Sequence, residues 1–208
     1  MARRYDHSRE EIRSMALDAA EAIVAAEGYK GLSARKVAAA IEYTVGTLYL
    51  VFENLNDLVL QVNGRTLDAL FERMAAVSGP ADSPRKRLLA LADAYIAYAK
   101  AETPRWNTLF EFVAENGNSL PDWYLVKLSK VFGLAETALE PLSDRRQALE
   151  VQQAARVLWA SVHGICMLKI RQRMDLAGGQ STEAMAGMLI DNFLRGFAAA
   201  SHGDQQTE

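Results

Sequence analysis

The sequence has few of the residues that form disulfides or bind metal ions: it contains one cysteine, Cys166, and three histidines among 208 residues. A single cysteine cannot form an internal disulfide, which is typical of a reducing compartment. It also lacks an uninterrupted run of about 18 apolar residues, the length that spans a membrane. Charged residues occupy the N-terminus, where a signal peptide would need an apolar stretch. We therefore expect a cytoplasmic protein with no membrane partner.

An excess of positive charge is lacking as well. The formal net charge is -3 at pH 7, which argues against a protein that coats nucleic acid by bulk attraction. Residues 1–52 carry as many basic as acidic side chains, but the basic ones are grouped. Arg3 and Arg4 precede the first expected helix, and Arg35 and Lys36 begin a later one. This grouping allows local DNA reading with few phosphate contacts and a modest salt dependence.

Alternation of apolar and polar residues, which would predict strands, is not sustained anywhere, whereas apolar residues recur at helical spacing. We predict an all-α protein of about nine helices. Ser8 and Glu11 have the spacing of a capping box at the first helix, which Gly28 and its neighbours end. Later helix starts are predicted at Ser33, Thr44, Asn54 or Asn56, Ser83-Pro84, Thr103-Pro104, Pro121, Ser143 and Thr182.

The expected helices fall into two domains that differ in helix length. Residues 8–55 contain three short helices and form the predicted helix-turn-helix domain. Residues 56–200 contain the longer helices of a predicted ligand-binding and dimerisation domain. The polar residues 201–208 are expected to be a disordered tail.

Residues 32–52 contain a short helix, a tight connection and a second short helix, which is the spacing of a DNA-reading helix-turn-helix. The first turn of the second helix holds Val45, Gly46 and Thr47. These side chains are small enough to let a backbone approach base edges in the major groove. Thr47 can also donate to a phosphate, and Val45 can pack on a thymine methyl. The pattern therefore predicts that this turn enters the groove.

Three larger side chains around this turn are candidates for polar DNA contacts. Arg35 can form two hydrogen bonds to guanine, Lys36 can pair with phosphate, and the hydroxyl of Tyr49 can reach a phosphate. The competing interpretation is an ordinary helical bundle with Arg35 and Lys36 on a solvated face, because this helix spacing recurs in unrelated folds.

Several spaced elements agree in order with one known pattern. They are Glu27-Gly28-Tyr29, Leu32-Ser33, Val37-Ala38 and Gly46-Thr47-Leu48-Tyr49, followed by Phe52 and Leu58. With them, the stretch 9–60 resembles the DNA-binding domain of the TetR family of bacterial transcriptional regulators. The resemblance implies a homodimer that binds a palindromic operator, usually represses, and releases DNA when a small molecule enters the C-terminal domain. The DNA contacts that it implies are made by Arg35, Thr44, Val45, Gly46, Thr47 and Tyr49.

Four positions depart from the family pattern. Glu42 stands in the turn where the family usually has glycine, so either the turn geometry differs or a positive φ is tolerated at about 1 kcal/mol. Leu55 replaces a lysine that often contacts phosphate, and Leu50 and Val51 replace a polar or aromatic pair. These changes bear on the operator sequence and on the phosphate contacts rather than on the fold.

The C-terminal half carries one local motif. Trp159 with His163-Gly164 resembles a Trp…His-Gly motif of one subgroup of TetR-type C-terminal domains. In the family, the long helix that holds this motif pairs with the last helix across the dimer, which implies a four-helix bundle. The expected interface residues are Val157, Met185, Leu189, Phe193 and Phe197.

Large side chains in the middle and late helices could line an apolar ligand cavity. The candidates are Tyr95, Trp106, Phe110, Trp123, Trp159 and Met167, with His163 as a polar group among them. Ordinary core packing accounts for each of them as well. His163 and Cys166 share a helical face, but two ligands are too few for a closed metal site. We expect no metal, no cofactor and no enzymatic activity, because three histidines and one cysteine offer no local catalytic signature.

Together these features predict a ligand-responsive DNA-binding regulator, more specifically a homodimeric repressor. Its predicted partners are double-stranded operator DNA, a second copy of the chain and an unidentified small-molecule effector. Two alternatives belong to other classes: a small-molecule-binding or enzymatic helical protein with a vestigial DNA motif, and a purely structural helical dimer. Substitution of Arg35 or Tyr49 separates them, since only the first function needs these side chains.

Overall fold

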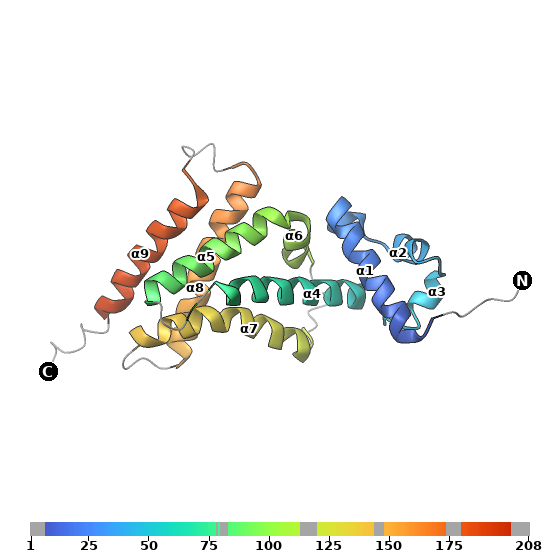
Figure 1. The fold of residues 1–208 in the computed structure, drawn as a ribbon, viewed down its shortest axis with the longest axis horizontal. Coiled ribbons are helices and arrows are strands. Elements are labelled where there is room, and N and C mark those ends of the chain that lie inside the picture. The colour runs from blue at the N-terminus through green and yellow to red at the C-terminus, as the bar shows by residue number, and fades with distance from the viewer. Residues whose placement is uncertain are drawn as a thin grey trace, which may run out of the picture. The chain divides into compact units, whose positions relative to one another are not determined.

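The structure, a computed structural model, describes residues 7–77, 79, 83–112, 120–143, 148–173 and 180–200. Its elements are helices throughout this part of the chain (Figure 1), which confirms the all-α fold. The α-helices are α1 (Arg9–Glu27), α2 (Ala34–Ala40), α3 (Val45–Leu48), α4 (Leu55–Ala76), α5 (Pro84–Ala101), α6 (Thr103–Glu111), α7 (Asp122–Leu139), α8 (Ala148–Ile170) and α9 (Thr182–Ala200). Two short 3-10 helices are η1 (Tyr29–Gly31) and η3 (Glu140–Leu142). The predicted tail 201–208 lies outside the described residues.

The contacts divide the chain into two compact units. The N-terminal unit holds the described residues of Met1–Asp68 and Glu102–Leu125, and the C-terminal unit holds those of Ala69–Ala101 and Val126–Glu208. This division differs from the boundary predicted at residue 56, because α6 packs on α1 and thereby joins the N-terminal unit. Two continuous helices, α4 and α7, each contribute residues to both units.

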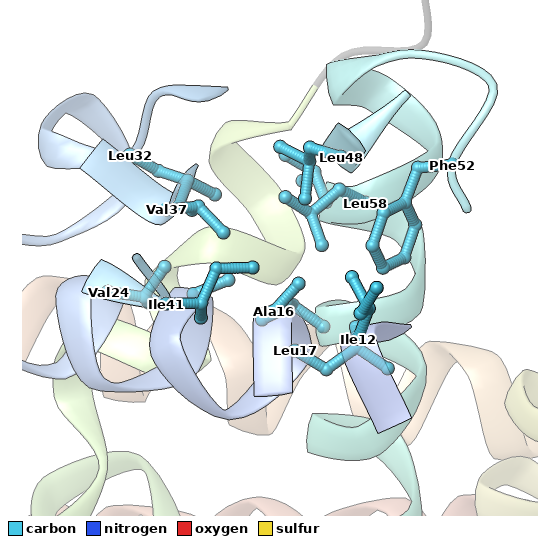
Figure 2. Close-up of a cluster of buried hydrophobic side chains, with 13 residues drawn as sticks. Ile12, Ala16, Leu17, Val24, Leu32, Val37, Ile41, Leu48, Phe52 and Leu58 are labelled. Carbon is cyan, nitrogen blue, oxygen red and sulfur yellow. The ribbon is translucent and has the colours of Figure 1, made fainter. Parts of the chain in front are cut away.

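The core of the N-terminal unit holds its short helices in place. At seven and four residues, α2 and α3 are too short to be stable alone. Figure 2 shows their apolar side chains meeting those of α1 and of the start of α4. The buried cluster includes Ile12, Ala16, Val24, Val37, Ile41, Leu48, Phe52 and Leu58. The apolar spacing predicted for α1 and α2 therefore faces one shared core.

The predicted caps of the first three helices are confirmed. Ser8 and Glu11 form a reciprocal capping box, in which the Ser8 N–H donates to Glu11 Oε2 at 2.6 Å. This hydrogen bond holds the pKa of the Glu11 carboxyl below its ordinary value. The Ser33 hydroxyl accepts from Lys36 N at 3.3 Å, and Thr44 Oγ1 accepts from Thr47 N at 3.2 Å. Each cap satisfies an N–H group that has no partner within its helix.

Later caps are confirmed in part. Asn54, rather than Asn56, caps α4, since Asn54 Oδ1 accepts from Asp57 N at 2.9 Å. One expected cap is wrong. Thr103 is the first helical residue of α6, and Glu102, without a side-chain cap bond, is its N-cap, because a single residue separates α5 from α6. Ser143 ends η3 in helical backbone (φ -84°, ψ -24°), and its hydroxyl donates to Glu140 O. The helix start predicted directly after Ser143 falls on residues 144–147, which lie outside the described residues.

The C-terminal unit is built from longer helices, among which α9 packs against both α5 and α8. The buried side chains between them include Leu88, Leu91, Ile96, Leu158, Val162 and Ile190. Two exposed ion pairs, Arg85 with Asp191 and Lys100 with Glu183, join α5 to α9 at the surface. Exposed pairs contribute about 0–1 kcal/mol each, so apolar burial stabilises this packing. Among the described helices, none is long and apolar enough to cross a membrane.

Candidate DNA-reading surface and ligand cavity

In the turn between α2 and α3, Glu42 adopts the left-handed backbone conformation that glycine usually adopts. Glu42 has φ 59°, and the following N–H, of Tyr43, donates to Ala38 O at 2.9 Å. Of the two alternatives for this turn, the structure therefore shows a tolerated positive φ, at a cost of about 1 kcal/mol. The Glu42 side chain is exposed, so no neighbouring side chain opposes this backbone conformation.

Six of the seven predicted DNA-contacting residues lie at least partly exposed around α2 and α3. Arg35, Lys36, Thr44, Gly46 and Tyr49 are exposed, and Val45 is half-buried. Thr47 is different, with an exposed fraction of 6% and its Oγ1 3.0 Å from Thr44 Oγ1. The hydroxyl of Thr47 is thus engaged in the cap of α3.

Gly46 lies exposed on α3, and the fold does not require a glycine there. A Cβ added at this position would meet only Thr44 Oγ1, at an ordinary contact distance of 3.7 Å, and the backbone φ is not positive. Glycine destabilises a helix by about 0.5–1 kcal/mol relative to alanine. Gly46 therefore lowers the helix stability without meeting a need of the fold in the described part of the chain.

The two basic side chains of α2 differ in their surroundings. Lys36 Nζ is paired with Glu27 Oε2 of α1, and both side chains are about half exposed. Arg35 is exposed and forms no ion pair or hydrogen bond with the described part of the chain. Arg35 is therefore available to a partner at no internal cost, whereas Lys36 would have to share its charge with Glu27.

Arg13 of α1 is a structural residue that the sequence did not reveal. Its Nη1 donates to Val51 O at 2.7 Å, and its guanidinium lies 5.1 Å from the ring centroid of Phe52. The carbonyl of Val51 belongs to the turn after α3, where backbone acceptors have no helical partner. Arg13 therefore fixes the chain directly after α3. Its partner is 38 residues away, so no local pattern could have indicated the contact.

A cluster of charged side chains joins three helices of the same unit. Arg65 of α4 pairs with Asp18 of α1 at 2.6 Å and lies 3.6 Å from Glu21. Arg105 of α6 lies 3.4 Å from the same Glu21 oxygen, and both side chains are only 21% exposed. The reduced solvation strengthens this pairing relative to a surface ion pair. The cluster therefore helps to hold α6 against α1.

The C-terminal unit contains an apolar cavity of about 60 Å³. Helices α4, α5, α7, α8 and α9 contribute its wall, which includes Met74, Leu88, Phe132, Leu158 and Ile190. Two of the predicted ligand residues, Tyr95 and Trp159, line it directly. His163 lies behind them: its Nδ1 is 2.9 Å from the Tyr95 hydroxyl, and its ring stacks on Trp159 at a centroid distance of 5.2 Å.

The remaining predicted ligand residues do not line this cavity. Trp106 is fully buried and packs against Phe110 in the N-terminal unit, where α6 contacts α1. Trp123 belongs to that unit as well and is 40% exposed. Met167 is half-buried on α8 and outside the cavity wall. The single predicted aromatic set thus divides between two units, because α6 packs on α1 rather than with the other long helices.

Burial shifts the pKa values of His163 and Cys166, the two reactive side chains of α8. Burial lowers the pKa of His163, so its imidazole is neutral at pH 7. Burial raises the pKa of Cys166 to about 12, which keeps it a thiol and a poor nucleophile or metal ligand. Within the described residues, no group of three or more potential metal-ligating side chains comes together.

Several apolar side chains of α8 and α9 lie exposed at the surface of the described chain. Val157, one of the predicted interface residues, is 55% exposed, and the others are half-buried, with Phe193 stacked on Phe197. Sequence reasoning missed three more exposed apolar residues, namely Leu149, Leu168 and Met188. Three of these exposed residues, Leu149, Val157 and Leu168, belong to α8. At 3.6 residues per turn, they lie within about 100° of one another around the helix axis.

Two family models match this chain. Residues 16–62 match the model described as bacterial regulatory proteins of the tetR family, and residues 88–193 match the tetracyclin repressor-like C-terminal domain. No curated protein is significantly similar in sequence.

Solved structures with a similar fold include a protein of unknown function from Rhodococcus sp. RHA1, at 20% identity and a TM-score of 0.73, covering 95% of this chain and 100% of that one. The TetR family transcriptional regulator PfmR from Thermus thermophilus has 18% identity and a TM-score of 0.58, with 86% and 97% covered. The transcriptional regulator FadR from Bacillus subtilis, in complex with stearoyl-CoA, has 14% identity and a TM-score of 0.65, with 87% and 97% covered. At these identities the likeness shows the fold alone.

Proposed function

Because this chain belongs to the TetR family of bacterial transcriptional regulators, we propose that the surface formed by α2 and α3 reads its operator and that the C-terminal cavity binds its effector. Members of this family are ligand-responsive DNA-binding repressors. The matched descriptions name regulatory domains, which point to a regulator rather than an enzyme. Its work on DNA would place it in the bacterial cytoplasm.

The observation that carries the DNA-reading proposal is Gly46, an exposed helical glycine that the fold does not need. In our proposal the backbone at Gly46 approaches the base edges, with Val45 beside it. Arg35 contacts guanine, and Thr44 and Tyr49 contact phosphates. Lys36 adds a phosphate contact when it releases Glu27, and Thr47 positions the turn through its hydrogen bond to Thr44.

The direct test starts from operator fragments selected from random DNA at low salt by the full-length protein. Arg35→Ala and Tyr49→Phe are then compared with the unchanged chain by fluorescence anisotropy. Loss of a base contact costs about 1–3 kcal/mol, so Arg35→Ala should lower affinity about tenfold or more. Arg171→Ala, which removes an exposed arginine from the C-terminal unit, is the matched control and should leave affinity unchanged. Failure to select any fragment would contradict the proposal.

A second experiment uses Gly46 itself. Gly46→Ala should raise the free energy of unfolding slightly, because alanine is the better helix former, and should weaken operator binding, because the added methyl group occupies the approach of the DNA. Gly133→Ala in α7 is the matched control, since its Cβ would meet nothing within 4 Å, and the Cβ at Gly46 would meet only Thr44 Oγ1 at an ordinary contact distance. The control should share the gain in stability and not the loss of affinity. Unchanged affinity of Gly46→Ala would exclude close approach at this residue.

We further propose that two copies associate through α8 and α9, where Val157 and Met188 are exposed. Two half-sites one DNA turn apart need reading helices about 34–36 Å apart, so effector binding would act by changing that separation. Val157→Glu should shift the protein to a monomer in light scattering and weaken operator binding. Val126→Glu, at an equally exposed valine of α7, is the control. A Val157→Glu protein that remains dimeric would contradict this assignment.

The motif of Trp159, His163 and Gly164 belongs to the same proposal for the cavity. Two observations support this proposal. Trp159 lines the cavity, and His163 stacks on Trp159 and contacts the Tyr95 hydroxyl. On this basis we propose that the C-terminal half belongs to the Trp…His-Gly subgroup. FadR from Bacillus subtilis was solved with stearoyl-CoA, and by analogy we propose a small-molecule ligand for this chain as well.

A further inference from the structure

The wall of the C-terminal cavity is unusually free of polar atoms. Among the side chains that line it, none is charged, and only Tyr95 and Trp159 carry a polar atom. Transfer of an ionised group into such surroundings costs several kcal/mol unless an opposite charge meets it. A carboxylate, phosphate or ammonium group of a ligand would therefore have no oppositely charged partner among the side chains of this wall.

The polar end of the cavity is itself neutral. The hydroxyl of Tyr95 lies 2.9 Å from His163 Nδ1, and Tyr95 is only 2% exposed. Because burial keeps the imidazole of His163 uncharged at pH 7, this pair provides hydrogen bonding without charge. It can orient one hydroxyl or carbonyl group of a ligand, and it does not compensate a negative charge.

One cation that packs against a side chain of this wall, Arg156, already has partners of its own. The guanidinium of Arg156 lies 5.1 Å from the ring centroid of Phe132. Its Nη1 donates to Glu136 Oε1 at 3.2 Å and to Gln152 O at 2.8 Å. An acidic ligand would have to compete with Glu136 for this arginine, so the site favours a neutral molecule over its carboxylate analogue.

The volume of the cavity further limits the class of ligand that it can bind. At about 60 Å³ it is less than half of an engineered cavity of about 150 Å³ that binds benzene. Ala92 and Ala135 leave this space open, and Met74 is a flexible side chain that can move to widen it. One ring can therefore be admitted by small side-chain shifts, whereas a long acyl chain far exceeds this volume.

We propose that the effector is a neutral, one-ring aromatic or similarly small apolar molecule with at most one hydroxyl or carbonyl group, bound between Ala92, Tyr95 and Trp159. This proposal rests on the proposed effector role of the same cavity. The proposed effector differs from a ligand with a long chain and a charged head group, because the cavity is too small for the chain and its wall has no charged side chain for the head group.

The test uses the full-length protein and four probes: toluene, p-cresol, benzoate and decanoate. Isothermal titration and thermal shift should show binding of toluene and p-cresol, with p-cresol tighter by about tenfold because it can bond to the Tyr95 and His163 pair. Benzoate, matched in size and charged, and decanoate, long and charged, should bind at least about tenfold more weakly than p-cresol. Benzoate or decanoate binding as tightly as p-cresol, or no binding of either neutral probe, overturns the proposal.

Two substitutions locate the binding. Ala92→Leu fills the cavity from α5 and should reduce p-cresol affinity about tenfold or more, whereas Ala97→Leu, at an exposed alanine of the same helix, should not. If Ala92→Leu does not fold, Tyr95→Phe provides an independent test, because it should remove the preference for p-cresol over toluene. An unchanged preference in Tyr95→Phe contradicts the assigned polar end.

Operator binding measured with and without p-cresol separates the two proposals. If the operator is bound but the neutral probes neither bind nor affect it, the ligand class is wrong and the DNA-reading function stands. If p-cresol binds in the cavity but no operator can be selected, the DNA-reading function fails and the cavity assignment stands.

Discussion

The two units arrange their functional residues in opposite ways. In the N-terminal unit, the exposed residues Thr44, Gly46 and Tyr49 lie on or next to α3, a helix of four residues that a filled core and the side-chain cap of Thr44 hold in place. In the C-terminal unit, the candidate site lies among long helices that leave about 60 Å³ unfilled. A surface that reads DNA needs a rigid backbone and small side chains, whereas a cavity that senses a molecule needs space that packing has not used.

The largest expected effect tests this contrast in packing. Leu48→Ala in the filled N-terminal core should lower the free energy of unfolding by about 3–5 kcal/mol. Leu158→Ala should cost less, about 2–3 kcal/mol, because one side of Leu158 already faces the cavity and has fewer contacts to lose. Urea unfolding of the full-length protein measures both. An equal or larger cost for Leu158→Ala would show that the C-terminal unit is packed as tightly as the N-terminal one.

A second prediction concerns the rigidity of the reading segment. Arg13→Met removes the hydrogen bond to Val51 O and the stacking on Phe52 while it keeps the length of the side chain. The free energy of unfolding should fall by about 2 kcal/mol, and operator affinity should fall with it. Arg9→Met, at an exposed arginine of the same helix, is the control for loss of charge. Equal effects of the two substitutions would remove the special role of Arg13.

The third prediction compares one strained residue in each unit. Glu42 and Gln172 are the described non-glycine residues with positive φ, at 59° and 55°. Glu42→Gly and Gln172→Gly should each raise the free energy of unfolding by up to about 1 kcal/mol, because glycine adopts this backbone without strain. Thermal melting detects the gain, and operator affinity should not change. A loss of stability in Glu42→Gly would mean that the turn is not strained.

The smallest change in stability is expected for the ion pair of Lys36 and Glu27, which are both half exposed. Either Lys36→Gln or Glu27→Gln should alter the free energy of unfolding by less than about 1 kcal/mol. Their effects on operator affinity should be opposite. Lys36→Gln should lower the affinity and reduce the slope of log affinity against log salt concentration by about one, whereas Glu27→Gln should raise the affinity by releasing Lys36. Equal, unaltered salt slopes in both would argue that Lys36 does not contact phosphate.

The sequence predicted those parts of the fold that depend on nearby residues. The caps at Ser8, Ser33 and Thr44 were predictable because each joins residues three positions apart. The expected cap at Thr103 failed because a single residue separates α6 from the preceding helix, and that residue, Glu102, is the N-cap. Long-range contacts were beyond such reasoning.

The candidate sites divide along the same line. The exposed residues of α2 and α3 follow from one contiguous motif, so the sequence placed them together. The division of the aromatic residues between the two units could not be predicted in this way. Helical periodicity shows that Trp106 and Trp159 are buried, but it does not show in which core each of them lies. Arg13 and Glu21 were missed for the same reason, since their partners lie far away in the chain.

The continuity of α4 bears on how the protein unfolds. One end of this helix places Leu58, Val59 and Val62 in the N-terminal core, and the other places Met74 in the wall of the cavity. A helix cannot lose its hydrogen bonds at one end without weakening the adjacent turn, because helix formation is cooperative. The free energy of local opening in one core is therefore linked to that in the other. The backbone amides along α4 should accordingly exchange with solvent as one cooperative group.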